Sequence, residues 1–263
     1  MAERPRAAQP EVWGAMTDVY DRYFMPFFSH YAADALRLAG ITAGSRVLDV
    51  ATGPGTLAVQ AAQMGAAVVA TDFSPGMITR LREHIADAKL TTITAEVMDG
   101  QALALPDDSF DAAFSMFGLM FFPDPAAGFR ELHRVLHPGG IAGVSAWLQG
   151  PPGPMFAEAM QRVLPDRSAP SNPHALLNDP EFFLHQMREA GFAEATVYPV
   201  THMAQIPTAE AYWEVSIRIP MIGPFPHAEE QAIHAALMDI LHAEFGDGPI
   251  RYETKAHIAI GVK

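Results

Sequence analysis

The stretch that most restricts the fold of this chain is residues 47–56, where a short apolar run enters a glycine-rich turn. The run reads Val-Leu-Asp-Val, as in a buried strand, and Ala-Thr-Gly-Pro-Gly-Thr follows it. Two glycines let the backbone approach a ligand closely, and a helix that begins at Thr56 would direct its free N–H groups at a negative part of that ligand. The pattern therefore predicts a strand, a turn and a helix that together form a binding site.

The turn by itself is compatible with two classes of cofactor. Gly53, Gly55 and Ala58 have the spacing of the relaxed dinucleotide pattern, which indicates a nicotinamide or flavin cofactor. Asp49, however, lies before the turn, where its carboxylate can face a cationic or amino-bearing group of a ligand. The alternative is a plain strand-to-helix turn in which Asp49 accepts hydrogen bonds from backbone donors.

Composition excludes several classes of partner and chemistry. The chain has 263 residues, which suits one domain with added helices, and a formal net charge of −13. Such a charge repels phosphate backbones and anionic membranes, so we expect no nucleic-acid partner. The absence of cysteine excludes disulfides, thiolate metal sites and thiol nucleophiles. No apolar run approaches the roughly 20 residues of a membrane helix, so we expect a soluble cytoplasmic protein without membrane insertion.

Strands and helices are expected to alternate along most of the chain. The expected strands are residues 46–50, 67–71, 92–97, 110–116, 141–147, 195–200 and 256–262. The expected helices are residues 12–25, 27–38, 56–64, 75–87, 125–136, 155–163, 179–190, 209–218 and 228–245. Alternation with short connections requires a parallel sheet covered on both faces, with ligands at the carboxyl ends of the strands. The predicted fold is a three-layer Rossmann-like α/β sandwich with a mostly parallel seven-stranded sheet and an antiparallel last strand.

The same pattern predicts how the chain is organised. The expected parts are a flexible tail at 1–10, N-terminal helices at 11–40, a cofactor-binding core at 41–148, an irregular insertion at 149–178, and the rest of the core at 179–263 with a helical lid at about 205–248. Six prolines between 149 and 173 mark the irregular part. A lid of this kind could cover the carboxyl ends of the strands.

Acidic residues follow three consecutive predicted strands. Asp72 ends the second strand, where a carboxylate can accept both hydroxyls of a ribose, and we expect Ser74 rather than Asp72 to cap the next helix. Asp99 follows the third strand, where it can accept a hydrogen bond from an adenine amine while Met98 and Phe73 stack on the ring. Each acid alone could be a turn residue. Three of them at the ends of three strands indicate a nucleoside-containing ligand.

These residues resemble the class I S-adenosylmethionine-dependent methyltransferases, and the nearest subgroup in pattern includes the quinone-ring C-methyltransferases. The resemblance is carried by residues 47–56, 68–77, 99–111 and 132–140. It implies that S-adenosylmethionine is the cofactor and S-adenosylhomocysteine the product. The cofactor contacts that it implies are Tyr20, Asp49, Ala51, Gly53, Pro54, Gly55, Asp72, Phe73, Met77, Met98, Asp99, Gly100, Met116 and Phe117.

Within that set the resemblance assigns roles to single positions. Asp49 and residues 53–55 would hold the methionine part, Asp72 the ribose and Asp99 the adenine amine. Tyr20 matches an N-terminal tyrosine that closes over the cofactor in such enzymes, with core packing as the alternative. The fourth strand ends in Ser-Met-Phe-Gly rather than in the Asn/Asp-Pro-Pro-Tyr/Phe run of nucleic-acid amino-methylating enzymes. No metal-binding motif of the divalent-ion-dependent catechol enzymes is visible, so we expect no metal.

No catalytic residue can be identified, because methyl transfer from a sulfonium depends mainly on positioning and on exclusion of water. His84, His133 and His137 are expected to have solvated or capping roles, whereas the histidines that could reach a substrate are His30, His174, His202 and His227. Apolar residues that could line a substrate cavity, pack the lid onto the sheet or form a homodimer contact are Met116, Phe117, Met120, Phe121, Phe122, Phe156, Tyr212, Trp213, Ile217, Ile219, Met221, Ile222 and Phe225.

The predicted function is therefore methyl transfer from S-adenosylmethionine to a small, apolar or aromatic metabolite, at oxygen, carbon or nitrogen. One alternative is a nicotinamide-dependent oxidoreductase, which would share the glycine turn and the ribose acid but have no use for Asp99. The other alternative is a cofactor-binding protein of the same fold without transfer activity.

Overall fold

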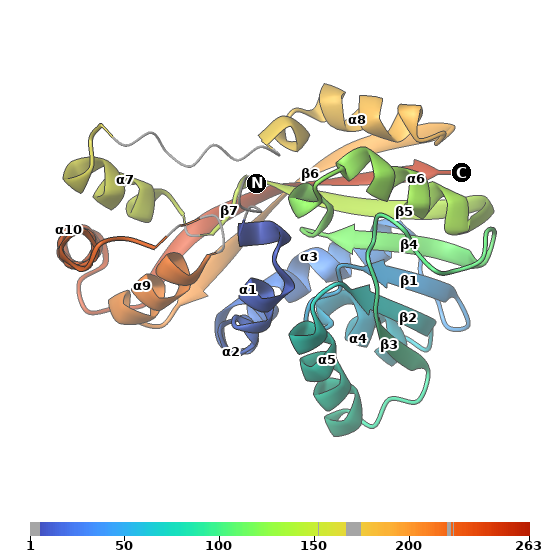
Figure 1. Cartoon of the computed structure of the whole chain (residues 1–263), viewed down its shortest axis with the longest axis horizontal. Helices are drawn as coiled ribbons and strands as arrows, with labels where there is room; N and C mark the ends of the chain where they lie inside the picture. The colour runs from blue at the N-terminus through green and yellow to red at the C-terminus, as the bar shows by residue number, and fades with distance from the viewer. Residues whose placement is uncertain (1–5, 152, 167–174, 220–221, 223) are drawn as a thin grey trace.

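The chain folds around one twisted sheet, seen in a computed structural model that describes residues 6–151, 153–166, 175–219, 222 and 224–263. The sheet in these residues has seven strands in the order β3-β2-β1-β4-β5-β7-β6 (Figure 1). β7 is antiparallel to both of its neighbours, and the other pairs are parallel. The predicted fold class is confirmed. The strands are β1 (Arg46–Val50), β2 (Ala67–Asp72), β3 (Ile93–Val97), β4 (Phe110–Met116), β5 (Leu136–Gln149), β6 (Glu194–Ile206) and β7 (Ile250–Val262).

Helices cover both faces of this sheet and extend beyond it. The α-helices are α1 (Pro10–Gly14), α2 (Thr17–Val19), α3 (Met25–Leu38), α4 (Thr56–Gln63), α5 (Pro75–Asp87), α6 (Pro125–Val135), α7 (Pro154–Val163), α8 (Pro180–Glu189), α9 (Ala209–Arg218) and α10 (His227–Phe245). Short 3-10 turns occur at η1 (Arg6–Ala8), η3 (Leu119–Phe121) and η4 (Ala175–Asn178), and η2 (Tyr20–Phe24) is a π-helix. None of the described helices is both long enough and apolar enough to cross a membrane.

The alternation of side chains along β1 divides the core into two layers. Val47 packs with α3, α4 and α5 on one face of the sheet, whereas its neighbour Leu48 packs with α6 and α8 on the other face. Because both faces are covered, all four residues from Val47 to Val50 are buried. The carboxyl ends of β1, β2 and β4 meet at one edge of the sheet, where Asp49 pairs with Ala70 and Phe114.

Two strands are much longer than expected. β6 and β7 pair from Glu194 to Ile206 and from Ile250 to Val262, and their distal halves form a two-stranded ribbon that leaves the core. α7, α9 and α10 pack on this ribbon at the left of Figure 1, away from β1, β2 and β3. The distal halves alternate buried and exposed side chains, the pattern of a half-buried strand, whereas the prediction followed the more continuous apolar runs and stopped where those ended.

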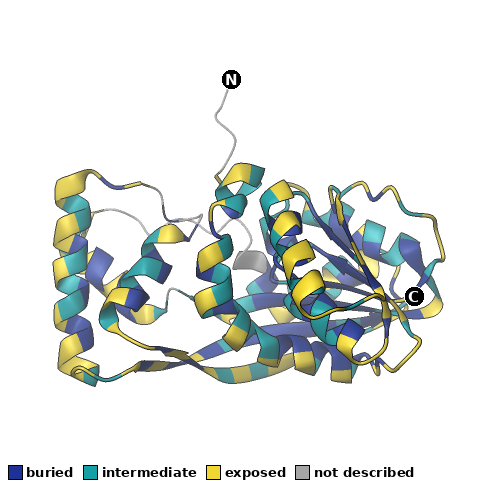
Figure 2. Ribbon diagram, turned by 90° about the horizontal axis from the view of Figure 1, so that it is seen from below, coloured by how far each residue is buried: buried dark blue, intermediate teal, exposed yellow. Residues whose placement is uncertain are grey.

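The N-terminal segment is more broken than the expected single helix over residues 12–25. It consists of α1, α2 and the π-helix η2, and it lies between the core and the distal helices (Figure 2). Pro26 does not separate two helices but occupies the first turn of α3, where its missing N–H costs no hydrogen bond. Residues 1–5 lie outside the description, whereas Arg6–Ala8 of the expected tail forms a short helix.

α1 packs directly on α5 through two glycines. A methyl group added to Gly76 would lie 2.7 Å from the Gly14 Cα atom, a distance that real contacts do not reach. Any larger residue at Gly76 must therefore move the N-terminal segment. The contact fixes how closely α1 approaches the beginning of α5.

Tyr31 connects α3, the helix that follows the N-terminal segment, to the last strand. Its hydroxyl is buried and lies 2.9 Å from the Thr254 carbonyl oxygen and 2.8 Å from the Thr254 Oγ1 atom.

We predict that Tyr31→Phe lowers the free energy of unfolding by about 1–2 kcal/mol, because a buried carbonyl loses its donor. Urea denaturation would measure this loss. Tyr198→Phe, at an exposed position on β6, is the matched control and should change stability by less than about 0.5 kcal/mol; equal effects of the two variants would contradict the prediction.

Candidate active site

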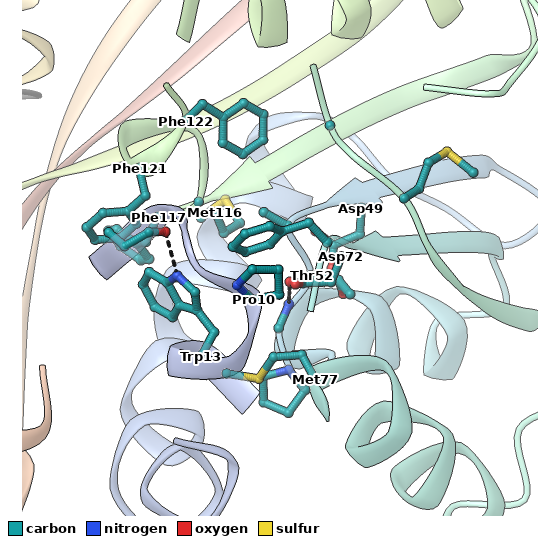
Figure 3. Close-up of a pocket in the computed structure, with 18 of the residues that line it drawn as sticks. Pro10, Trp13, Asp49, Thr52, Asp72, Met77, Met116, Phe117, Phe121 and Phe122 are labelled. Carbon is teal, nitrogen blue, oxygen red and sulfur yellow. Dashed lines mark hydrogen bonds between the residues drawn. The ribbon is translucent and has the colours of Figure 1, made fainter. Parts of the chain in front are cut away.

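One large cavity opens at the carboxyl ends of β1, β2 and β4. Its volume is about 980 Å³, at the upper end of the range for ligand pockets in proteins. Figure 3 shows Asp49 and Asp72 on one side of it and the aromatic rings of Trp13 and Phe121 on the other. The described residues that line it are Arg6, Ala7, Ala8, Pro10, Trp13, Tyr20, Phe28, Ala32, Asp49, Ala51, Thr52, Gly53, Pro54, Thr56, Leu57, Asp72, Phe73, Met77, Met98, Asp99, Gly100, Gln101, Met116, Phe117, Gly118, Phe121, Phe122 and Pro123.

The structure brings nearly all of the predicted cofactor contacts together. Every predicted cofactor contact lines this cavity except Gly55. Gly55 is the N-cap of α4, with φ at +96°, and a methyl group added to it would collide with Leu81 of α5. The second glycine of the turn is thus required for the close packing of α4 against α5 rather than for a lining surface.

Asp49 is buried at the end of β1 and tied to the turn by one of its two oxygens. Its Oδ2 atom accepts hydrogen bonds from the Thr52 hydroxyl at 2.6 Å and from the Ala58 N–H at 3.1 Å. The carboxylate therefore has the turn-stabilising role that the sequence left open as an alternative, and it also lines the cavity. Loss of solvent raises the pKa of Asp49 to about 7.

Asp72 holds the glycine turn from the neighbouring strand. Its Oδ2 atom accepts the Gly53 N–H at 2.9 Å, and its Oδ1 atom accepts the Ser74 N–H at 2.8 Å. Ser74 is the N-cap residue of α5, as expected, but its hydroxyl makes no capping hydrogen bond and donates to the Pro10 carbonyl oxygen at 2.8 Å instead. Burial raises the pKa of Asp72 to about 6, against the opposing effect of the two backbone donors.

The third acid lies in a more open part of the cavity. Asp99 is exposed, and its Oδ1 atom accepts hydrogen bonds from the Gln101 N–H at 2.9 Å and from the Gln101 side-chain amide at 3.1 Å. Phe73, Met98 and Phe122 provide apolar surface around it. The site thus joins a flat apolar slot with an acceptor at its edge, an arrangement that suits a planar ring bearing an amine.

The N-terminal segment forms the opposite wall, and most of its lining residues were not predicted. Trp13 lies 4.9 Å from Phe121 between ring centroids, and its indole N–H donates to the Ala7 carbonyl oxygen at 2.8 Å (Figure 3). Tyr20 lines the cavity as predicted, and burial together with the nearby Asp72 raises the pKa of its hydroxyl. The apolar spacing around Trp13 predicted a helix there, but spacing carries no information on which distant surface a helix faces.

Phe117 at the end of β4 has a strained backbone. Its φ is +57°, a conformation that L-residues rarely adopt, and its N–H donates to the buried Ser145 hydroxyl at 2.9 Å. Its ring stacks on Trp147, with centroids 3.7 Å apart and planes 5° apart. These contacts hold the ring against the cavity despite the strain, so β4 ends in a rigid aromatic surface.

The expected lid does not lie over this cavity in the described part of the chain. No described residue of α7, α9 or α10 lines it, and side chains such as Phe156, Tyr212, Ile219 and Phe225 are buried in a cluster with the β6 and β7 ribbon and with residues of the N-terminal helices. Packing, one of the alternatives for these residues, accounts for them. Met120, a residue of η3, is likewise buried in the core, and Met221 lies outside the described residues.

The candidate histidines do not reach the cavity either. The His202 Nε2 atom contacts the Asp34 carboxylate at 2.8 Å, and the His30 and His202 rings lie 5.3 Å apart on the other side of α3. His227 begins α10. None of these three lines the cavity in the described residues, and His174 lies outside them.

Comparisons with known proteins agree on one family. Residues 47–140 match a family model described as a methyltransferase domain. An uncharacterized protein of Mycobacterium tuberculosis is 35% identical over 205 residues, which cover 76% of this chain and 74% of that protein. Demethylmenaquinone methyltransferase of Clavibacter sepedonicus is 36% identical over 173 residues, covering 60% of this chain and 69% of the relative.

Solved structures show the same fold. A Methanococcus maripaludis protein whose crystal structure was solved as that of a proposed S-adenosyl-L-methionine-dependent methyltransferase is 25% identical, with a TM-score of 0.55 over 75% of this chain and 91% of that one. The phosphoethanolamine N-methyltransferase 2 of Haemonchus contortus, solved with S-adenosylhomocysteine, is 20% identical, with a TM-score of 0.57 over 89% of this chain and 52% of that one.

The buried carboxylate of Asp49 makes stability depend on pH in a direction that can be tested. The folded state binds the Asp49 proton more tightly than the unfolded state does, so its contribution is most favourable below about pH 4 and declines until pH passes about 7. Asp49→Asn keeps an oxygen for Thr52 and Ala58 but carries no charge. We predict that the stability of this variant relative to the natural chain rises by about 1–3 kcal/mol between pH 5 and pH 8, measured by urea denaturation without cofactor.

Asp99→Asn is the matched control on the same cavity wall. Its carboxylate is exposed, so the substitution should not alter how stability varies between pH 5 and pH 8. A constant difference between Asp49→Asn and the natural chain across this range would contradict the burial of the Asp49 charge.

Proposed function

Because the chain belongs to the S-adenosylmethionine-dependent methyltransferase family, we propose that its cavity binds this cofactor against β1, β2 and β3 and a small apolar acceptor against the N-terminal segment. The observation that carries the proposal is the large cavity at the carboxyl ends of β1, β2 and β4, which has carboxylates on one side and aromatic rings on the other (Figure 3). A charged, polar cofactor and an apolar acceptor need these two kinds of surface next to each other.

The groups on the acidic side fit the cofactor. Asp72 is proposed to accept the ribose hydroxyls with the lone pairs that its two backbone donors leave free. Asp99 is proposed to accept the adenine amine, with Phe73 and Met98 against the ring. Asp49 and the turn at Gly53 are proposed to hold the methionine part, where the unused Asp49 oxygen suits an ammonium group.

The chain's own residues have to position and enclose the reactants. When bound, S-adenosylmethionine supplies an electrophilic methyl group on a sulfonium. Trp13, Tyr20 and Phe117 exclude water from the space between the acidic and aromatic sides, which favours attack by the acceptor rather than hydrolysis. The rigid end of β4 at Phe117 and Met116 fixes one wall for the acceptor, so that orientation supplies much of the rate enhancement.

The proposed acceptor is a small molecule with a flat apolar ring, methylated at carbon, oxygen or nitrogen. Trp13 and Phe121 offer a tilted aromatic pair against which such a ring can stack. The name of the Clavibacter relative, demethylmenaquinone methyltransferase, denotes a quinone substrate for that protein and supports the same chemical class here. The nicotinamide-dependent alternative is not retained, because the chain belongs to the methyltransferase family.

The assignment of the acids predicts their effect on cofactor affinity. Asp72→Ala and Asp99→Ala should each weaken S-adenosylhomocysteine binding by about 1–3 kcal/mol, or about fivefold to a hundredfold, because each removes a charge-assisted hydrogen bond. Isothermal titration calorimetry measures the change. Asp87→Ala, at the exposed end of α5 and away from the cavity, should leave the affinity within about twofold. Unchanged binding in both cavity variants would refute the roles given to Asp72 and Asp99.

The acceptor side predicts a different signature. An acceptor is first identified by incubation with methyl-labelled S-adenosylmethionine and a panel of phenols, hydroxyquinones and amines. Trp13→Ala should then raise the KM for that acceptor about tenfold or more, because a buried aromatic contact is lost, and leave the cofactor Kd within about threefold. Trp213→Ala, on α9 and away from the cavity, is the control. A loss of cofactor affinity without a change in acceptor KM would show that Trp13 contacts the cofactor rather than the acceptor, and would contradict its assignment to the acceptor side.

A further inference from the structure

His84 on α5 contacts two segments that line the cavity, although the His84 side chain does not line the cavity itself. Its Nδ1 atom lies 2.9 Å from the carbonyl oxygen of Pro54, in the glycine turn. Its Nε2 atom lies 3.3 Å from the Oδ1 atom of Asp21, in the π-helix that also carries Tyr20. The expectation of a solvated or capping role missed these contacts, because a capping histidine and a bridging one look alike in sequence.

The two partners of His84 both require a proton from the ring. The Pro54 carbonyl can only accept a hydrogen bond, so Nδ1 must carry a hydrogen. The Asp21 carboxylate can also only accept, so Nε2 must carry a hydrogen if the contact is to be attractive. A neutral imidazole has one N–H group and satisfies one partner, whereas the imidazolium has two and satisfies both.

The Asp21 oxygen that faces His84 is buried and accepts no hydrogen bond from the described residues. A buried carboxylate oxygen without a donor is costly, and such atoms are rare in folded proteins. His84 Nε2 is the ring nitrogen next to it. The unsatisfied oxygen therefore supports, independently of the ring's own bonds, a state in which Nε2 is protonated.

The charged groups around this contact come from α2, η2 and α5. Arg80 contacts Asp21 through Nε at 3.3 Å, Asp18 through Nη2 at 2.6 Å and Glu83 through Nη1 at 2.9 Å. Three acids and one arginine thus surround this contact. Arg80 contacts the other Asp21 oxygen whether or not His84 is protonated. Only the contact between His84 and Asp21 therefore depends on the His84 proton.

We propose that His84 is a positioning residue of the cofactor site: its imidazolium fastens the Tyr20 segment to the glycine turn, and loss of its proton releases the contact with Asp21. The proposal rests on the proposed function, because it regulates closure of the same cofactor site. Histidine changes charge between pH 5 and pH 8. The segment that carries Tyr20, residues 10–24, is accordingly held against α5 and the glycine turn at the acidic end of this range and is less tightly held at the alkaline end.

The first test needs no cofactor. Amide hydrogen exchange in the free protein, corrected for the intrinsic effect of pH, should show residues 10–24 about threefold or more less protected at pH 8 than at pH 6. Peptides from α8, on the opposite face of the sheet, provide the internal reference. Equal protection of residues 10–24 at both pH values overturns the proposal, and this arm stays informative even if the proposed cofactor does not bind.

Two variants separate the His84 proton from other titrations. In Asp21→Asn the side-chain amide can donate to the neutral His84 Nε2 atom while its oxygen still accepts from Arg80, so the protection of residues 10–24 should become nearly independent of pH. Asp18→Asn removes another Arg80 partner on the same segment and should keep the dependence of the natural chain. A dependence in Asp21→Asn equal to that of the natural chain overturns the role of this contact.

A second readout links the contact to the cofactor. The dissociation rate of S-adenosylhomocysteine, measured by stopped flow, should rise about threefold or more from pH 6 to pH 8 in the natural chain and less than twofold in Asp21→Asn. If hydrogen exchange responds to pH as expected but S-adenosylhomocysteine does not bind at all, the proposed function fails and the His84 contact stands. If binding occurs with equal pH dependence in both proteins, the contact does not control the cofactor and the proposal fails.

Discussion

Two buried carboxylates on adjacent strands hold the glycine turn, and the shape of the site depends on them. Asp49 binds the beginning of α4 through the Ala58 N–H, and Asp72 binds the turn through the Gly53 N–H. Each carboxylate is desolvated, and burial raises the pKa of both. The turn is therefore preorganised at a cost in electrostatic free energy, a cost that is reduced when a ligand brings donors or positive charge next to these oxygens.

The N-terminal segment completes the site by binding to the same framework. The Ser74 hydroxyl holds the Pro10 carbonyl oxygen, and the glycine contact between Gly14 and Gly76 brings α1 onto α5. The beginning of α5 thus contacts Asp72, and the next two turns of the helix carry Arg80 and His84, which contact Asp21 of the π-helix. One helix therefore connects the floor of the cavity to the segment that covers it.

The sequence predicts the core of this fold well because two independent signals agree there. β1 and β4 have the predicted bounds, since buried parallel strands are continuous apolar runs between clear turn residues. The acids could be placed in one site because the topology brings the ends of neighbouring parallel strands together. The hydrogen-bond partner of Ser74 could not be predicted, because its acceptor at Pro10 is 64 residues away and depends on how α1 docks. The prediction that α9 and α10 cover the cavity was wrong for the same reason. The apolar residues of a helix indicate that it is buried, but they do not indicate which other element covers it.

The bond between Tyr31 and Thr254 has a consequence for the order in which the chain folds during synthesis. The two residues are 223 positions apart, so the helix that carries Tyr31 leaves the ribosome long before its partner strand exists. The Tyr31 ring can pack on Phe117 and Trp147 as soon as β4 and β5 are made, but its buried hydroxyl has no partner until β7 follows. The hydrogen bond that fastens α3 to the last strand is therefore among the last contacts that can form. Such a chain depends on a slow, non-local closing step before its fold is complete.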